Sequence, residues 1–166
     1  MRILIRLILV VAVAALAFWL WTIFFPGPEK IIRGRLTSLA RDVSFSPDEN
    51  NLVKIAHAQG VADFFATNVE VDISVPEHEQ QSIAGRDEIT QAVLISRQQL
   101  TALNVKFPDV NVAVASDKNS ATADVTVEAT VPGERDPAVQ EVKFIFEKAD
   151  GQWLIDKVTT VRVVTP

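Results

Sequence analysis

The sequence of 166 residues predicts an α+β domain, in which three helices pack on a curved and mainly antiparallel sheet in ααβαβββ order, preceded by a single transmembrane helix. Three observations lead to this prediction. Alternating apolar residues mark strands, apolar residues at helical spacing mark amphipathic helices, and the first 25 residues are almost entirely apolar. Because a sheet with one apolar face must be covered, we expect the helices to lie on that face. The predicted parts are a transmembrane anchor over residues 1–27 and a folded domain over residues 28–166.

The apolar start of the chain, Leu7 to Phe25, is an uncharged run of 19 residues. As a helix it would span about 28 Å, close to the hydrocarbon core of a bilayer. Trp19 and Trp21 stand near its far end, where interfacial indoles are expected. The alternative is a cleaved signal peptide, since Ala15-Leu16-Ala17 matches the A-x-A pattern. Cleavage there would leave an exposed apolar N-terminus, so we prefer the single-pass anchor.

The basic residues on the two sides of this span favour opposite orientations in the membrane. Arg2, Arg6 and the terminal amine favour a cytoplasmic N-terminus. Four basic residues follow the span closely and favour the opposite orientation; they are Lys30, Arg33, Arg35 and Arg41. Because a short basic tail before a first span usually behaves as a signal anchor, we expect the domain outside the cytoplasm, in the periplasm.

Two helices are expected directly after the span. Apolar residues at helical spacing predict the first helix over Pro28–Val43. The second is expected to begin at Ser46-Pro47-Asp48-Glu49 and to run to about Phe64, because Ser46 can cap and Glu49 completes a capping box. The residues predicted to share its inward face are Leu52, Ile55, Ala56, Gln59 and Asp63.

A strand and a third helix follow. Residues 68–75 alternate, so that the valines and Ile73 face one way and Glu70 and Asp72 the other. Residues 76–84 are predicted to form a polar loop that contains His78. The third helix is expected to open at Gly85-Arg86-Asp87-Glu88-Ile89, with acidic residues in its first turn. Its inward stripe is predicted to be Ile89, Ala92, Val93, Ser96 and Leu100.

The remainder of the chain predicts only strands. Residues 105–115 and 121–131 form two of them, and Pro108 indicates a bulge or an edge position in the first. Residues 141–158 alternate on both sides of Asp150-Gly151, which is a strong signal for a hairpin. The apolar face of this closing hairpin would be formed by Val142, Phe144, Phe146, Trp153 and Ile155.

The composition of the domain excludes several classes of function. Of the 16 basic residues only Arg2 and Arg6 precede the domain, so 14 basic groups face all 21 acidic ones, a balance of −7. This acidity argues against nucleic acid and anionic lipid headgroups as partners. The chain has no cysteine, which excludes disulfides, thiolate metal sites and cysteine nucleophiles. We expect no cofactor and no bound metal.

Three short stretches carry a resemblance to a known family. Ala66-Thr67-Asn68-Val69-Glu70-Val71 precedes a strand, Gly85-Arg86-Asp87-Glu88-Ile89 opens the third helix, and Gly151-Gln152-Trp153-Leu154-Ile155 lies in the last hairpin. In their order and spacing, over residues 30–164, they resemble the SnoaL-like branch of the NTF2-like superfamily. The resemblance implies a cone-shaped fold with a pocket at its open end, and a homodimer through the outer sheet face. The family contains isomerases, dehydratases, cyclases, hydrolases and non-catalytic modules, so the fold alone does not assign a function.

Glu70 and Asp72 are the first candidates for chemistry. Steroid isomerases of this superfamily place a catalytic carboxylate near the corresponding part of the first long strand. Here both acids lie opposite the apolar residues of that strand, so they should face away from the pocket. Those enzymes also use a tyrosine hydroxyl in the oxyanion hole, and this chain has no tyrosine. We therefore expect both acids on a solvated or partner-facing surface.

The remaining pocket candidates are Gln59, Asp63, His57 and Trp153. A half-buried Asp63 could act as a general acid or base. Alternatively the helix frays near Gly60 and leaves Asp63 in a loop. His57 has no second histidine at ligand spacing, so metal binding is not expected. Trp153 is expected in the core or in the wall of the pocket.

Three functions remain open at this point. The first, which we favour, is a membrane-tethered module that binds a protein or a small apolar ligand and has no catalytic activity. The second is a SnoaL-like isomerase or hydrolase of a small apolar molecule, with Asp63 as its acid or base. The third is a subunit of a bacterial envelope or secretion assembly, since proteins of the VirB8 type resemble this plan of a short tail, one span and an NTF2-like domain. The sequence contains no Ser-His-Asp arrangement, phosphate loop or nucleotide fingerprint.

Overall fold

The structure is a computed structural model that describes residues 11–16, 19, 26–73 and 81–164. Residues 11–16 are helical. Most of the predicted span Leu7 to Phe25 lies outside the described residues, and so does His78 of the predicted polar loop. None of the helices in the described ranges is both long enough and apolar enough to cross a membrane. The transmembrane anchor therefore stays a prediction.

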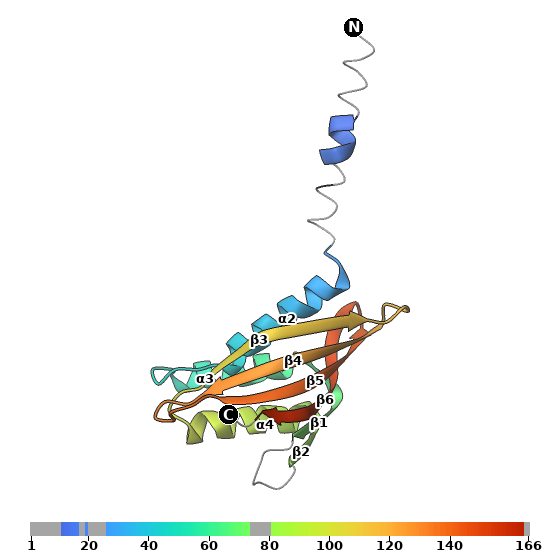
Figure 1. Cartoon of the computed structure of the whole chain (residues 1–166). Coiled ribbons are helices and arrows are strands. Elements are labelled where there is room, and N and C mark those ends of the chain that lie inside the picture. Colours follow the sequence, from blue (N-terminus) through green and yellow to red (C-terminus); the bar gives the residue numbers. More distant parts are fainter. Residues whose placement is uncertain (1–10, 17–18, 20–25, 74–80, 165–166) are drawn as a thin grey trace.

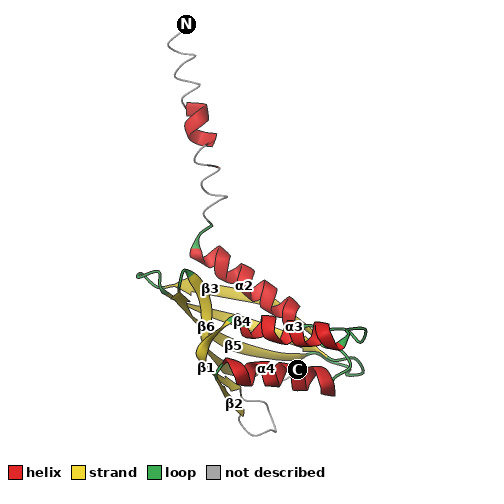
Figure 2. Ribbon diagram, turned by 180° about the vertical axis from the view of Figure 1, so that it is seen from behind, coloured by secondary structure: helices red, strands yellow, loops and turns green. Residues whose placement is uncertain are grey.

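The folded domain has the order ααββαββββ along the chain (Figure 1). Its elements are α2 (Pro28–Val43), α3 (Asn51–Ala62), β1 (Phe65–Ile73), β2 (Gln81–Ala84), α4 (Arg86–Gln99), β3 (Asn104–Val114), β4 (Ser120–Thr130), β5 (Ala138–Ala149) and β6 (Gln152–Val164). The helices α2, α3 and α4 lie side by side on one face of the sheet (Figure 2). This arrangement confirms the predicted α+β architecture.

The sheet has six strands in the order β2-β1-β6-β5-β4-β3. Neighbouring strands are antiparallel except β1 and β6, which are parallel. The strand β2 was predicted as part of a polar loop, and this prediction is wrong. Gln81–Ala84 instead pairs with the end of β1, where Val71 lies opposite Ile83. Four residues are too few for an alternation to stand out against a polar background.

The start of α3 also differs from the prediction. Asn50 is the N-cap, and its side chain accepts a hydrogen bond of 2.9 Å from the backbone N–H of Val53. The predicted capping box at Ser46 and Glu49 is not formed, because the helix begins four residues later. Asn caps as well as Ser does, so the competing cap is physically reasonable. The carboxylate of Glu49 is therefore free to make other contacts.

The predicted inward face of α3 is wrong as well. Ala58, Val61 and Ala62 are buried, whereas Leu52 is 80% exposed and Ile55 is 49% exposed. The buried face is built largely from alanines, which let the helix approach α2 and α4 closely but give a weak periodic signal. The larger side chains of Leu52 and Ile55 dominate the pattern in the sequence, although they point outward.

The core lies between the helices and the inner face of the sheet. From α2 it receives Ile32, Leu36 and Leu39. The predicted apolar face of the closing hairpin is confirmed, since each of its five side chains is 7% exposed or less. The rings of Phe107 and Phe144 lie 6.1 Å apart, which joins β3 to β5 over the intervening strand β4. The interior near the helices is thus occupied by the domain's own side chains.

The bulge and edge position that Pro108 indicates are both found in β3. The register against β4 shifts between Lys106 and Asp109, and β3 ends the sheet. Proline lacks a backbone N–H, so it weakens pairing on the free side of an edge strand. Near the start of β3, Leu103 also forms an isolated antiparallel bridge with Phe45.

The free side of β3 is closed by α2, which runs along it in the opposite direction. The hydroxyl of Ser44 accepts a hydrogen bond of 2.9 Å from the N–H of Val105. Further along, the guanidinium of Arg33 donates a hydrogen bond to the carbonyl oxygen of Val110. Unpaired strand edges promote association with other chains, and these contacts oppose it.

Replacing Arg33 tests this closure. We expect Arg33→Ala to lower the free energy of unfolding by about 1 kcal/mol, because it removes one hydrogen bond, and to increase self-association through the opened edge. Urea unfolding and sedimentation velocity measure the two effects. Arg41→Ala is the matched control, since Arg41 lies on the same helix but is exposed and pairs with its neighbour Asp42 rather than with β3. Equal behaviour of the two variants would contradict the closure.

Candidate functional site

The four pocket candidates lie at three places in the fold. Trp153 is 2% exposed and belongs to the core, and the ammonium of Lys148 lies 5.9 Å from the centre of its ring. This is the end of the sheet at the β5–β6 turn. His57 lies at the other end, beside the residues that follow α2. Gln59 and Asp63 line a cleft between α3 and α4. The candidates therefore do not converge on one pocket.

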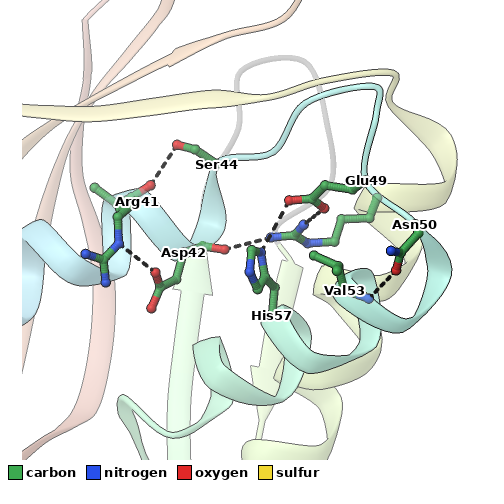
Figure 3. Close-up of polar contacts among 9 residues, drawn as sticks. Arg41, Asp42, Ser44, Glu49, Asn50, Val53 and His57 are labelled. Atoms are coloured by element: carbon green, nitrogen blue, oxygen red, sulfur yellow. Dashed lines mark hydrogen bonds and ion pairs between the residues drawn. The ribbon is translucent and has the colours of Figure 1, made fainter.

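His57 belongs to an ionic network around the buried side chain of Arg97, which is 2% exposed. Glu49 joins the two residues. One of its carboxylate oxygens accepts a hydrogen bond from Arg97, and the other lies 3.3 Å from Nδ1 of His57. Figure 3 shows the contact between Glu49 and His57 as a dashed line. Arg97 also donates a hydrogen bond of 2.7 Å to the carbonyl oxygen of Asp42.

This network is structural rather than open to a ligand. The guanidinium of Arg97 lies 4.8 Å from the centre of the Phe45 ring, so an aromatic face covers it as well. The side chain of Glu49 is only 13% exposed. A buried cation needs a nearby anion and further acceptors. Glu49 and the carbonyl of Asp42 bind the two terminal nitrogens of Arg97, while its Nε is buried without a hydrogen-bond partner.

Sequence reasoning missed Arg97, although a signal was present. Arg97 follows Val93 by four residues, and Val93 follows Ile89 by four, so the arginine continues the inward stripe of α4. A charged residue on an apolar stripe predicts a buried ion pair. Its partner Glu49 could not be identified from the sequence, because the pattern around Ser46 predicted that Glu49 belongs to a capping box.

The carboxylates of Glu70 and Asp72 face outward, as their position in β1 predicts. Val69 and Val71 beside them are buried, while the side chain of Glu70 is 62% exposed. The ammonium of Lys157 on β6 lies 2.8 Å from Glu70 and 3.9 Å from Asp72. The hydrogen bond and charge of Glu70 raise the pKa of Lys157 above its ordinary value. Both acids thus form surface ion pairs on the sheet.

The cleft between α3 and α4 is open and polar, with a volume of about 640 Å³. Its lining comprises Gln59, Ala62, Asp63, Arg86, Asp87, Thr90 and Gln91. The helix α3 does not fray at Gly60, and Asp63 forms its C-cap. The side chain of Asp63 is 78% exposed, so it lacks the burial that we expected for a general acid or base.

Two arginines form hydrogen bonds with the backbone that follows α3. Arg86 donates hydrogen bonds of 3.1 and 2.5 Å to the carbonyl oxygen of Phe65, and Arg35 donates one of 3.3 Å to that of Asp63. The guanidinium of Arg35 lies 5.0 Å from the Phe64 ring. Burial lowers the pKa of Arg35, while the charge of Asp63 opposes this effect. The cleft can therefore bind polar groups, but its arginines are already engaged with the backbone.

A metal site is not supported by the part of the chain that the structure covers. Across residues 11–16, 19, 26–73 and 81–164 no three His, Cys, Asp or Glu side chains come together in a way that could hold an ion.

Comparison with known proteins identifies the fold. No protein-family model matches the sequence, and no curated protein matches it. Among solved structures, the yeast UBP3-associated protein BRE5 is 14% identical, with a TM-score of 0.63 over 86% of this chain and 100% of that chain. An NTF2-like protein of unknown function from Pseudomonas putida is 12% identical, with a TM-score of 0.58 over 78% and 82% of the two chains.

A third similar structure is that of a protein provisionally named a scytalone dehydratase, from Novosphingobium aromaticivorans. It is 16% identical, with a TM-score of 0.60 over 82% of this chain and 84% of that chain. At such low identity these similarities establish the NTF2-like fold alone. The same fold serves proteins with different names, so the function must be argued from the residues of this chain.

The Arg97 network leads to a prediction about stability. We expect Glu49→Gln to lower the free energy of unfolding by about 2–3 kcal/mol, because it leaves the Arg97 charge buried without its anion. Urea or thermal unfolding measures the loss. Asp42→Asn is the matched control and should change stability by about 0.5 kcal/mol or less, since Arg97 bonds to the backbone of Asp42 and not to its carboxylate.

The double variant Glu49→Gln with Arg97→Met should recover part of the loss, because no buried charge then remains. A loss in Asp42→Asn as large as that in Glu49→Gln would contradict this account of the network.

Proposed function

We propose that this chain is a membrane-tethered NTF2-like module that binds a partner and has no catalytic activity. One observation carries the proposal: the candidate side chains lie at different places in the fold, and Asp63, the candidate acid or base, is 78% exposed in an open cleft. Trp153 is in the core, His57 contacts Glu49, and Glu70 is paired with Lys157 on the outer surface. Catalysis requires an acid or base and a bound substrate within hydrogen-bond reach of each other, and these positions do not offer that.

The tether and the location of the domain belong to the same proposal. The apolar run Leu7 to Phe25 supports a single-pass anchor, and the short basic tail before it supports a domain in the periplasm. A tether of this kind confines the domain to a thin layer beside the membrane, so its partners would be concentrated in that layer. Weak surface contacts can then suffice for binding.

Protein partners fit this module better than a small apolar ligand. The inner face of the sheet is covered by the domain's own apolar side chains, whereas the cleft between α3 and α4 is open and polar. The likeness to BRE5, which is described as associated with another protein, is in line with this choice. Fold similarity at 14% identity adds no information about which partner this chain would bind.

A homodimer through the outer sheet face is part of the proposal. The outer face carries a shallow hollow of about 300 Å³, lined in part by the small side chains Ala113 and Thr122 and by the half-buried Ile145. Ion pairs flank it, including Lys143 with Asp124 at 3.4 Å. Small side chains let two sheets approach closely, and charged neighbours can pair across a two-fold axis.

Two alternative functions remain. A SnoaL-like isomerase or hydrolase that uses Asp63 is favoured by the similar structure named as a scytalone dehydratase. Its weakness is the exposure of Asp63, which leaves that carboxylate in a solvated surface cleft. A subunit of an envelope or secretion assembly, on the plan of VirB8-type proteins, is a special case of the binding module in which the partner is the assembly.

Labelling with a reagent that does not cross membranes tests the proposed location. The chain has no cysteine, so a single cysteine introduced at a chosen position is the only thiol that can react. We expect Ser116→Cys, in the exposed turn after β3, to react with an impermeant maleimide in spheroplasts, whereas Ile3→Cys should react only after lysis. The reverse pattern would place the domain in the cytoplasm.

Crosslinking in intact cells tests the proposed binding function. We expect the tagged full-length chain to be recovered in discrete protein complexes, at the same yield for the wild type and for His57→Gln. The yield should not change, because His57 has a structural role at the surface of the Arg97 network. Recovery of the chain alone, or together with a small molecule in its interior, would contradict the proposal.

A further inference from the structure

A cleft of about 520 Å³ lies where the start of α2 meets the turn between β3 and β4. Its lining comes from two stretches that are far apart in the sequence: Gly27, Pro28, Glu29 and Lys30, and Val114, Ala115, Ser116 and Lys118. Figure 1 shows the end of β3 beside the start of α2, at the end of that helix where the chain enters the domain. The cleft therefore lies at the corner of the domain that is nearest to the predicted anchor.

The predicted anchor brings this corner close to a membrane surface. The apolar run ends at Phe25, and α2 begins at Pro28, three residues later. Three residues of extended chain span at most about 11 Å. The headgroup layer on each side of a bilayer is about 5–8 Å thick. With the run ending at the edge of the hydrocarbon, the start of α2 lies in or just outside the headgroups, and the β3–β4 turn lies beside it.

The charge of the cleft suits phospholipid headgroups that carry both signs. Its charged lining residues are Lys30, Lys118 and Glu29, a balance of +1, although the domain as a whole has 14 basic and 21 acidic groups, a balance of −7. Both lysines are exposed, and their long side chains can place an ammonium group on a lipid phosphate. Glu29 is exposed as well and can meet the cationic end of a headgroup. Because the overall acidity opposes a strongly anionic surface, the fit is to zwitterionic lipids.

The acidic residue of the turn does not cancel this local charge. Asp117 is not among the residues that line the cleft. Its carboxylate accepts hydrogen bonds of 3.0 and 3.3 Å from the backbone N–H groups of Asn119 and Ser120. These bonds lower the pKa of Asp117, and their dipoles offset part of its negative charge. The next residue, Lys118, has a positive φ of 56°, where glycine or asparagine is more usual, and it is exposed beside the cleft.

We propose that the corner formed by the start of α2 and the β3–β4 turn rests on the headgroups of the bilayer that holds the anchor, with Lys30 and Lys118 at lipid phosphates. This inference rests on the tether of the proposed function, and it names the surface through which the domain meets the membrane. The contact gives the domain a fixed orientation. The strand β2, at the opposite edge of the sheet from β3, then faces away from the bilayer.

The tether favours the bilayer over other occupants of the cleft. A free phosphate or an acidic peptide would have to be captured from solution by exposed lysines, whose individual ion pairs are weak. The bilayer is instead held beside the cleft by the chain itself, so its headgroups are present at a high effective concentration. Contacts that would be too weak for a dissolved ligand are then sufficient.

Fluorescence quenching by lipid headgroups tests the contact. The full-length chain is labelled with a fluorophore at a single cysteine, either Asn119→Cys in the β3–β4 turn or Ser82→Cys on β2. It is placed in phosphatidylcholine nanodiscs that contain a lipid with a nitroxide on its headgroup. Both positions are exposed, and neither lines the cleft. We expect the quenched fraction at residue 119 to exceed that at residue 82 about threefold or more, because opposite edges of the sheet lie more than about 20 Å apart.

Charge variants give the second readout. Lys30→Gln with Lys118→Gln should lower the quenched fraction at residue 119 about twofold, since two ion pairs with phosphates are lost. Added salt should act in the same direction, because exposed ion pairs are screened. Lys54→Gln with Arg135→Gln is the matched control. It removes the same charge on α3 and in the loop after β4, outside the cleft, and should leave the quenched fraction unchanged.

Three outcomes would overturn the proposed contact. They are equal quenching at the two labelled positions, quenching at residue 119 that survives Lys30→Gln with Lys118→Gln, and an equal loss in the control variant. A chain that is not retained in the nanodiscs would overturn the tether and the contact together. A chain that is retained but is quenched equally at both positions rejects the contact alone, and leaves the tether and the binding function in place.

Discussion

The junction of the three helices depends on one buried charge. The guanidinium of Arg97, near the end of α4, contacts the carbonyl of Asp42 at the end of α2, the ring of Phe45 and the carboxylate of Glu49 just before α3. A buried cation is costly unless all these acceptors are present together. The network therefore fixes where α2 ends and where α3 begins, and it holds both against α4.

The exposed apolar side chains of α3 follow from that junction. With its start held by Glu49, α3 turns Ala58, Val61 and Ala62 toward the core, and Leu52 and Ile55 are left outside. The sheet plays the complementary role. Its inner face is filled by the core, and its outer face carries ion pairs such as Lys157 with Glu70. Among the described residues, the cleft between α3 and α4 and the outer face of the sheet are thus two surfaces open to recognition.

Much of the architecture follows from sequence patterns with strong local signals. The Asp150-Gly151 turn, the helix Pro28–Val43 and the outward direction of Glu70 are each determined by residues close in sequence, and each is confirmed. The strand β2 and the orientation of α3 were not predicted, because pairing with β1 and packing against two other helices are long-range effects. The candidate site was predicted only in part. Gln59 and Asp63 do share a cleft, but its other wall belongs to α4, and no local pattern indicates that proximity.

The parallel pairing of β1 with β6 has a consequence for how the chain can fold. Phe65 pairs with Ile155 and Glu70 with Lys157, so the contact spans most of the domain's sequence. The strand β6, which leaves the ribosome after the other five strands of this sheet, is the one that joins β1 and β2 to the meander of β3, β4 and β5. Contacts of such long sequence separation form slowly, and the unpaired strands are prone to aggregation until they do. If the domain is translocated, the early helices and β1 must stay unfolded or chaperoned until β6 has followed them across.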